Sequence, residues 1–297
     1  MREMYPQKGG EENMPLVSII MGVYNAEDTI DRCIESIRNQ TYTNWEFIIC
    51  DDCSTDNTLE RLLKLSKEED RIHILRNRSN QRLAASLNHC LSKASGKYVA
   101  RMDADDYSLK DRILKQVQFM ESHNAIDVVG TAAYIFDGKD KTDIRLCPEY
   151  PETKDLVMST PYIHPSIMMR KNVYDELHGY TVSRRTVRGQ DLDLWYRFYE
   201  KGFRGYNMQE PLLVYHETID DYKKRSVESG LLATKTNIIG LRRIKSPLYT
   251  YVFALRPLVS SLLPPIIMKA YHKQKSKRNN CQQHVSTHRK NSNYDII

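Results

Sequence analysis

The stretch that decides the fold reads Gly96-Lys97-Tyr98-Val99-Ala100-Arg101-Met102-Asp103-Ala104-Asp105-Asp106. Residues 98–102 are mostly apolar and follow a glycine, which predicts a short buried strand. Three carboxylates at the end of such a strand repel one another unless a cation lies among them. A hard divalent ion accepts carboxylate oxygens and keeps positions open for phosphate oxygens. The cluster therefore predicts a divalent-cation site, and a solvated acidic turn is the alternative.

Strands and helices alternate upstream of this cluster. Residues 16–24 form a nearly continuous apolar run, which is typical of a strand covered on both faces. Asn25 is the expected N-cap of the helix that follows. Further strands are predicted at 46–50 and 72–75, and helices with inward apolar faces at 30–37, 59–63 and 83–94. This alternation predicts an α/β fold with a doubly wound, mostly parallel sheet.

The pattern downstream is less regular. Apolar residues at helical spacing predict a helix with Ile113, Val117 and Met120 on its buried side. Strands are expected at 128–136, 167–170 and 210–215, a helix at 191–201, and a looser stretch up to residue 161. Beyond residue 221 the chain is expected to be helical before a basic tail.

Composition places the chain among ordinary globular proteins, because 40% of its 297 residues are hydrophobic and 28% are charged. The net charge of +6 comes from the tail, since residues 269–290 hold seven Lys and Arg and no acid. We find no apolar run long enough to span a bilayer and no signal-peptide pattern, and we expect a cytoplasmic location.

The six cysteines mostly occupy apolar-face positions and are interpreted as reduced thiols. Cys50 and Cys53 have the spacing of a redox or metal pair. No second pair completes a metal site, so a structural role is favoured for both.

Several side chains are expected at the carboxyl edge of the sheet. Tyr24 and Asn25 end the first strand, Asp51 and Asp52 end the second, and the acidic cluster ends the fourth. Ligands of open α/β sheets bind at this edge. An aromatic face suits a nucleobase, and Asp52 could accept a hydrogen bond from a pyrimidine N–H. Alternatively, Tyr24 covers the core and the aspartates cap the next helix.

Taken together, these segments resemble family 2 glycosyltransferases of the GT-A fold. The resemblance runs from about residue 16 to residue 215. The matching stretches are VSIIMGVYN (17–25), NQTY (39–42), DDCSTD (51–56), NQRLAASLN (80–88), GKYVARMDADD (96–106), HPS (164–166), MMR (168–170) and QDLDLW (190–195).

The resemblance implies a role for each matched residue. Tyr24, next to Asn25, would stack on the donor base, which is usually uracil, and Asp52 would read the edge of that base. Asp103 would face the ribose, and Asp105 would ligate Mg²⁺ or Mn²⁺ on the diphosphate. Asp191 would be the general base, taking the proton of the acceptor hydroxyl in a single displacement that inverts the anomeric carbon.

Two departures from the family pattern affect the site. Gln190 stands where the family often has Glu, so one acidic group near the acceptor is missing. Cys53 and Arg82 stand where Gly is frequent. Arg82 could point toward the diphosphate, but a solvated loop cation is the preferred interpretation.

Three further residues are weaker candidates. His164 is expected near the acceptor cleft, although a lone histidine is more often a loop or core residue. His216 could supply an imidazole to the metal. Trp195 is expected in the core, and flooring a sugar site is the alternative.

The resemblance implies a domain organisation. We expect a non-core segment at 1–14 and a catalytic domain at 15–220. Residues 1–13 are polar and carry no fold pattern, so Met14 is the expected start of translation and Met1 is the alternative. The catalytic domain divides into a nucleotide-binding half (15–107) and an acceptor half (108–220), and a helical extension with the basic tail (221–297) follows. Residues 255–290 fit a peripheral contact with an anionic membrane, and a packed helix with a solvated tail is the alternative.

The chain is thus expected to be an inverting, metal-dependent glycosyltransferase. Its donor would be a nucleotide-sugar, most simply a UDP-sugar, and its acceptor a lipid-linked or saccharide hydroxyl in bacterial polysaccharide synthesis. Two alternatives are a sugar-1-phosphate nucleotidyltransferase, which would need a glycine-rich loop where residues 24–27 stand, and a catalytically silent scaffold. Nucleic acid is not an expected partner, because few aromatic residues interleave with the charges of the tail.

Overall fold

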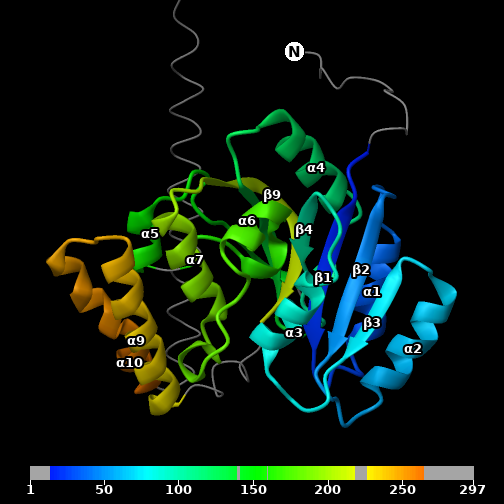
Figure 1. The fold of residues 1–297 in the computed structure, drawn as a ribbon, viewed down its shortest axis with the longest axis horizontal. Helices are drawn as coiled ribbons and strands as arrows, with labels where there is room; N and C mark the ends of the chain where they lie inside the picture. Colours follow the sequence, from blue (N-terminus) through cyan, green and yellow to red (C-terminus); the bar gives the residue numbers. More distant parts are fainter. Residues whose placement is uncertain (1–13, 139–140, 159, 218–225, 264–297) are drawn as a thin grey trace, which may run out of the picture.

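The computed structural model describes residues 14–138, 141–158, 160–217 and 226–263 (Figure 1). Residues 1–13, on which the expected translation start at Met14 depends, lie outside the described residues. The basic tail at 269–290 also lies outside them. The first half alternates strands and helices in the order β1 (Val17–Val23), α1 (Ile30–Arg38), β2 (Trp45–Asp51), α2 (Thr58–Glu68), β3 (Ile72–Arg76), α3 (Leu83–Leu91) and β4 (Tyr98–Arg101).

The second half mixes short and long elements. They are β5 (Tyr107–Ser108), α4 (Arg112–Ser122), β6 (Val128–Phe136), β7 (Lys141–Arg145), α5 (Thr153–Met158), η2 (His164–Ser166), β8 (Met168–Arg170), α6 (Lys171–Glu176), η3 (Arg184–Thr186), α7 (Gln190–Glu200) and β9 (Gly205–His216). A C-terminal helical part follows with α9 (Val227–Arg243), η4 (Leu248–Leu255) and α10 (Arg256–Ser261).

The described strands form one nine-stranded sheet in the order β3-β2-β1-β4-β8-β6-β9-β5, with β7 paired to β6. Strands β1 to β4 are parallel to one another, and β6 is parallel to β9. The short strands β5, β7 and β8 run against their neighbours. The prediction of a mostly parallel α/β sheet is therefore confirmed, and the antiparallel strands all belong to the less regular second half.

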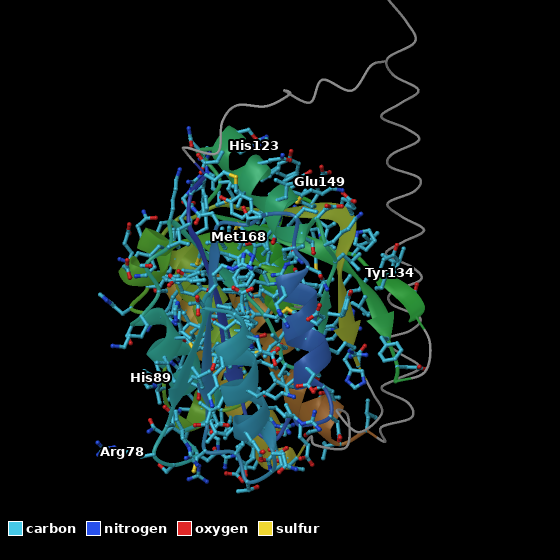
Figure 2. The ribbon with its side chains drawn as sticks, turned by 90° about the vertical axis from the view of Figure 1, so that its right-hand side faces the viewer. Arg78, His89, His123, Tyr134, Glu149 and Met168 are labelled. Atoms are coloured by element: carbon cyan, nitrogen blue, oxygen red, sulfur yellow. The ribbon has the colours of Figure 1, made fainter. Side chains whose placement is uncertain are left out.

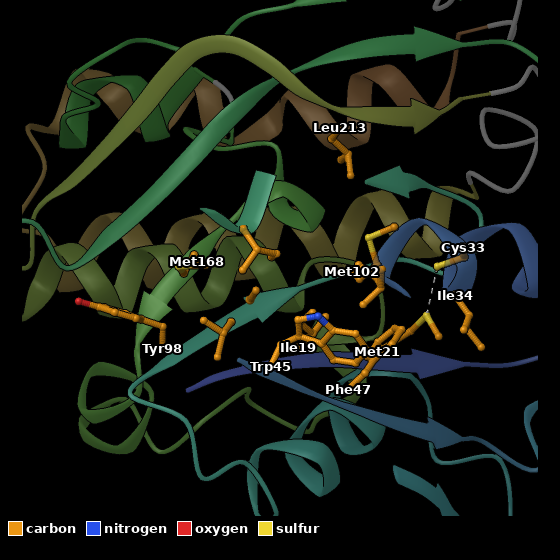
Figure 3. Packing of buried hydrophobic residues seen from close by; sticks show 14 of the residues in the cluster. Ile19, Met21, Cys33, Ile34, Trp45, Phe47, Tyr98, Met102, Met168 and Leu213 are labelled. Carbon is orange, nitrogen blue, oxygen red and sulfur yellow. Dashed lines mark hydrogen bonds between the residues drawn. The ribbon is translucent and has the colours of Figure 1, made fainter. Parts of the chain in front are cut away.

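Helices cover both faces of this sheet. Alternate residues of β1, among them Ile19 and Met21, join a core with α1, α2 and α4, where Ile113, Val117 and Met120 are buried as predicted. Figure 3 shows Ile19, Met21, Trp45 and Phe47 packed together in this core. The intervening residues of β1, such as Ile20, join a second core with α3, α6 and α7. The period-2 alternation of strand side chains thus produces the doubly wound arrangement.

The carboxyl ends of the parallel strands all meet at one edge of the molecule. Arg78, in the loop after β3, lies at this edge, whereas His123 at the end of α4 lies at the opposite end (Figure 2). The loops after β1, β2, β3 and β4 therefore share the edge at which the ligand site was expected.

Two local expectations were wrong. Asn25 is not an N-cap: α1 begins after Thr29, because the N–H of Ala26 donates to Thr58 Oγ1 at 2.7 Å and holds a turn ahead of the helix. Leu63 was expected to point inward together with Leu59 and Leu62. Leu62 is buried, but Leu63 is 46% exposed, since α2 lies at the margin of the sheet.

The C-terminal helices pack against the acceptor half. A side chain at Gly240 of α9 would collide with the ring of Tyr196 in α7, at 2.0 Å, so glycine allows the two helices to approach closely. Helix α10 in turn packs against α9. Within the described ranges, no helix is long and apolar enough to cross a membrane.

Candidate active site

A cavity of about 390 Å³ opens at the carboxyl edge of the sheet. Its walls come from six separate parts of the chain: the start of α3, the end of β4, the segment after β7, η2, the start of α7 and the end of β9. Lining residues include Asp103, His164, Gln190, Asp191 and Glu217. The fold thus brings together side chains that are far apart in the sequence, and two carboxylates that the sequence marked, Asp103 and Asp191, line the same cavity.

Arg101 places Asp103 in the cavity wall. The guanidinium of Arg101 is buried, and its Nη1 lies 2.5 Å from Asp103 Oδ1. Burial opposes the charge on Arg101, but the Asp103 carboxylate holds the pKa of Arg101 above its usual value. The buried cation therefore fixes the direction of the Asp103 side chain.

Asp191 lies at the first turn of α7, directly after Gln190 and Gly189. Gly189 has φ 137°, a conformation that glycine adopts readily, and it turns the chain into the helix. The Leu192 N–H donates to Asp191 Oδ1 at 2.8 Å. Burial raises the pKa of Asp191 despite this bond, while the charge of Arg101 opposes the rise. A buried carboxyl group with a raised pKa in a cavity makes Asp191 a candidate functional residue.

Asp193, two residues further on, has a different environment. Its carboxylate pairs with Arg185 at 2.6 Å and Arg197 at 2.9 Å, and it accepts a hydrogen bond from Thr181. Burial alone would raise the pKa of Asp193, but these partners lower it. These contacts of Asp193 hold α7 in place. Asp193 is not among the residues that line the cavity.

Asp52 holds the loop that precedes α3. Its Oδ1 accepts hydrogen bonds from Asn77 Nδ2 at 2.7 Å and from the Gln81 N–H at 2.8 Å, and its Oδ2 accepts one from the Arg82 N–H at 2.8 Å. The side chain is almost completely buried. This structural role was not predicted from the sequence, because the donors come from a loop about 25 to 30 residues away.

Three non-glycine residues with positive φ cluster at this edge. They are Asn25 (51°), Cys53 (64°) and Arg82 (73°). Left-handed backbone is costly for residues with a side chain and is concentrated at functional sites. Asn25 Oδ1 accepts a hydrogen bond from the Thr55 N–H at 2.9 Å, which ties the loops after β1 and β2 together. Beside it Tyr24 is 46% exposed, so its side chain is accessible to a ligand at this edge.

The acidic cluster is joined by His216, the last residue of β9. His216 Nδ1 lies 3.6 Å from Asp105 Oδ2, and the His216 N–H donates to Asp106 Oδ1. Asp106 Oδ2 is buried without a hydrogen-bond partner in the structure, and burial raises the pKa of Asp106 well above its usual value. In the part of the chain that is described, no three side chains already converge on an ion position. Asp105 and His216 fit a divalent ion that takes its remaining ligands from a diphosphate.

Trp195 packs against His164 behind the cavity lining. His164 lines the cavity, and its Nε2 lies 2.9 Å from the Tyr180 hydroxyl oxygen. Burial and the nearby charge of Arg101 lower the pKa of His164 well below its usual value. Trp195 is fully buried and packs edge-on against His164. Trp195 is thus a core residue, and its alternative as the floor of a sugar site does not fit its burial.

Three charged cavity residues were not predicted from the sequence. Arg145 and Glu217 line the cavity as an ion pair with an N–O distance of 2.5 Å. Both lie outside the regular pattern, so no signal in the sequence pointed to their pairing. Arg101 could have been noticed, because an arginine inside an apolar strand needs a buried partner.

The class of protein follows from this arrangement. A mostly parallel α/β sheet carries an exposed aromatic residue, two acidic strand ends and a cavity carboxylate at one edge, which together define a nucleotide-sugar glycosyltransferase of the GT-A fold. The sequence profile of "Glycosyl transferase family 2" matches residues 18–209. The chain belongs to this family.

Known proteins agree with this assignment. A Bacillus subtilis protein named glycosyltransferase EpsE is 46% identical over 267 residues, covering 88% of this chain and 94% of its own. The Escherichia coli protein WfgD, named a UDP-Glc:α-D-GlcNAc-diphosphoundecaprenol β-1,3-glucosyltransferase, is 42% identical over 109 residues, covering 37% of this chain and 42% of its own. A Pyrobaculum calidifontis mannosyltransferase, solved with GDP-Man and Mn²⁺, superposes with a TM-score of 0.61 at 16% identity over 89% of this chain and 81% of that one.

Proposed function

We propose that the protein transfers a sugar from a UDP-sugar to a hydroxyl of a lipid-linked or saccharide acceptor, with inversion, in the synthesis of a bacterial surface polysaccharide. The observation that carries the proposal is the shared cavity of Asp103 and Asp191. Asp103 belongs to the acidic motif of the donor side, and Asp191 lies in the first turn of the helix of the acceptor side. A base and a donor that meet in one cavity allow direct displacement.

On the donor side we assign the nucleotide to the loops after β1, β2 and β3. The exposed ring of Tyr24 would stack on the base, and Asn25 would shape the loop beneath it. Asp52 Oδ2 accepts one described hydrogen bond, so a carboxylate oxygen with two lone pairs retains the capacity to accept a second from a base N–H. Asp103 would face the ribose. Residues 15–107 would form this nucleotide-binding half.

Asp105, with His216 beside it, would hold Mg²⁺ or Mn²⁺ against the diphosphate. When bound, the ion stabilises negative charge that develops on the departing nucleoside diphosphate. Carboxylate oxygens suit both ions, and the imidazole favours Mn²⁺ over the harder Mg²⁺.

On the acceptor side, Asp191 would accept the proton of the attacking hydroxyl. The raised pKa of Asp191 makes it a stronger proton acceptor than an ordinary aspartate. His164 and Gln190 line the same cavity and can orient the acceptor by hydrogen bonds. We assign the acceptor half to residues 108–220. A lipid-linked acceptor is supported by WfgD, whose name specifies a diphosphoundecaprenol-linked sugar.

The test is a screen of UDP- and GDP-sugars for thermal stabilisation with and without Mn²⁺, followed by product analysis with the stabilising donor. The proposal predicts metal-dependent stabilisation by UDP-sugars and release of UDP. Release of pyrophosphate from a sugar 1-phosphate and UTP would instead indicate a nucleotidyltransferase. Stabilisation with no turnover on any lipid-linked or saccharide acceptor would indicate a binding protein.

A further inference from the structure

A stripe of exposed apolar side chains runs along η4 and α10. Side chains three residues apart eclipse one another in a 3₁₀ helix, and those three and four apart share a face of an α-helix. The exposed residues are spaced three apart in η4, and three or four apart from the end of η4 through α10. They are Tyr249, Val252, Leu255, Val259 and Leu262, which are 46–75% exposed. We call these five residues the C-terminal apolar stripe.

The stripe faces away from a well-packed underside. Thr250 and Ala254 of η4 are buried, and Arg256 Nη1 donates to the Met158 carbonyl oxygen at 2.6 Å. Helix α10 packs on α9, which packs on α7, so η4 and α10 lie at the end of the molecule remote from β1 to β3 (Figure 1). The elements that carry the stripe are thus anchored, while the apolar side chains themselves remain exposed. Contiguous exposed apolar surface of this kind marks an interaction site.

The charge of this part of the chain is strongly one-sided. Residues 226–290 contain twelve Lys and Arg and a single acid, Glu228. Arg184 pairs with Glu228 at 2.6 Å, and Arg243 pairs with Glu200 of the body. Seven of the twelve cations lie in residues 269–290, a few positions after the stripe ends. The combination therefore selects a partner that offers both an apolar interior and a negatively charged surface.

We propose that the C-terminal apolar stripe binds an anionic lipid bilayer, with its side chains inserted at the level of the headgroups. Apolar side chains on a helix face and neighbouring Lys and Arg are the two features that hold interfacial helices on anionic membranes. The inference goes beyond the proposed activity and does not depend on it.

The experiment measures co-sedimentation of the full chain with vesicles of phosphatidylglycerol and phosphatidylcholine, compared with vesicles of phosphatidylcholine alone. The wild type should bind the anionic vesicles and lose affinity between 0.1 and 0.5 M salt, about the range over which the screening length shrinks from roughly 10 Å toward 3 Å. Equal binding to both vesicle types at all salt concentrations would overturn the proposal.

The key variant is the triple substitution Val252→Ser/Leu255→Ser/Val259→Ser. All three side chains are exposed, so the melting temperature should be unchanged. Loss of three inserted side chains should weaken vesicle binding at least about tenfold. The matched control is Leu63→Ser/Tyr150→Ser, which removes exposed apolar side chains elsewhere and should bind like the wild type.

Two further arms separate the alternatives. If the triple variant binds vesicles like the wild type but changes from dimer to monomer in light scattering, the stripe is a self-association surface and the membrane proposal is wrong. Asp191→Asn should bind vesicles like the wild type even when it is inactive. Failure of the proposed activity would therefore leave the membrane result intact, and the reverse also holds.

Discussion

The backbone N–H of Arg82 donates to Asp52 Oδ2 at 2.8 Å, although Arg82 has φ 73° and ψ 165°. This region of backbone space is almost restricted to glycine. The Gln81 N–H donates to the other oxygen of the same carboxylate. Asp52 thus holds an arginine in a conformation that glycine would adopt more easily, at the edge assigned to the nucleotide.

Replacing Arg82 by Gly tests why this conformation is kept. Relief of strain should stabilise the fold by about 1–3 kcal/mol. If the guanidinium contacts the donor diphosphate, UDP affinity should fall at the same time. Cys53→Gly is the matched control, since it relieves a positive φ of 64° without removing a cation, and it should leave UDP affinity unchanged. Thermal melts and UDP titrations measure both effects. Unchanged UDP affinity in Arg82→Gly would favour the solvated interpretation of Arg82.

Replacing Asp52 by Asn should destabilise the protein. The amide nitrogen cannot accept the hydrogen bonds that Asp52 now receives from Gln81 and Arg82, so at least one buried N–H loses its partner at a cost of about 1–3 kcal/mol. Urea unfolding measures this loss. Asp28→Asn, at an exposed site in a neighbouring loop, should change stability little. An Asp52→Asn protein as stable as the wild type would contradict the anchoring role.

Metal dependence should rest on Asp105 and, to a smaller extent, on His216. Asp105→Ala should remove the increase in UDP affinity that Mn²⁺ causes, because a ligating carboxylate is lost while the charge of the diphosphate remains. His216→Ala should reduce the increase, and Asp28→Ala should preserve it. Calorimetric titration of UDP with and without Mn²⁺ provides the measurement. A wild-type metal effect in Asp105→Ala would place the ion elsewhere.

Activity should fall on the acid side of a pH profile. A general base acts only when deprotonated, and the pKa of Asp191 is raised above the ordinary value of 3.8. Turnover should therefore decline as the pH falls through this raised pKa, at pH values above 3.8. The buried Arg101 opposes the rise, so Arg101→Met should move the decline to still higher pH. A rate that stays constant down to pH 3.8 in folded enzyme would contradict the assignment of Asp191.

The sequence predicted the regular elements well and the connections poorly. The run at 16–24 and the helix with Ile113, Val117 and Met120 follow from local periodicity, which depends only on neighbouring residues. The N-cap at Asn25 failed because Ala26 hydrogen-bonds to Thr58, a residue from another loop. No local pattern contains that contact.

The candidate site likewise contains residues that were predicted from the sequence and contacts that were not. The acidic motif and Asp191 were marked by residue type and by resemblance to the family, and the fold places Asp103 and Asp191 in one cavity. The ion pair of Arg145 with Glu217 depends on the pairing of both β7 and β9 with β6. The anchoring role of Asp52 depends on a distant loop. Such contacts are set by tertiary structure and leave little trace in the sequence.

The different environments of Asp191 and Asp193 predict opposite effects on stability and turnover when each is replaced by Asn. Asp193→Asn breaks a buried ion pair and should cost about 3–5 kcal/mol of stability, with near-normal turnover per folded molecule. Asp191 has a raised native pKa, so its contribution to stability is present below pH 3.8 and is lost as the pH rises through the native pKa. Asp191→Asn should therefore not lower the melting temperature at pH 7.

The most direct measurement is the turnover of Asp191→Asn beside Gln190→Glu and the wild type, with UDP affinity recorded for each. General-base catalysis contributes about 10²–10⁴-fold, so Asp191→Asn should lose at least a hundredfold in turnover while binding UDP normally. Gln190→Glu should stay within a small factor of the wild type. Wild-type turnover by Asp191→Asn would show that Asp191 is not the base and would contradict the proposed mechanism.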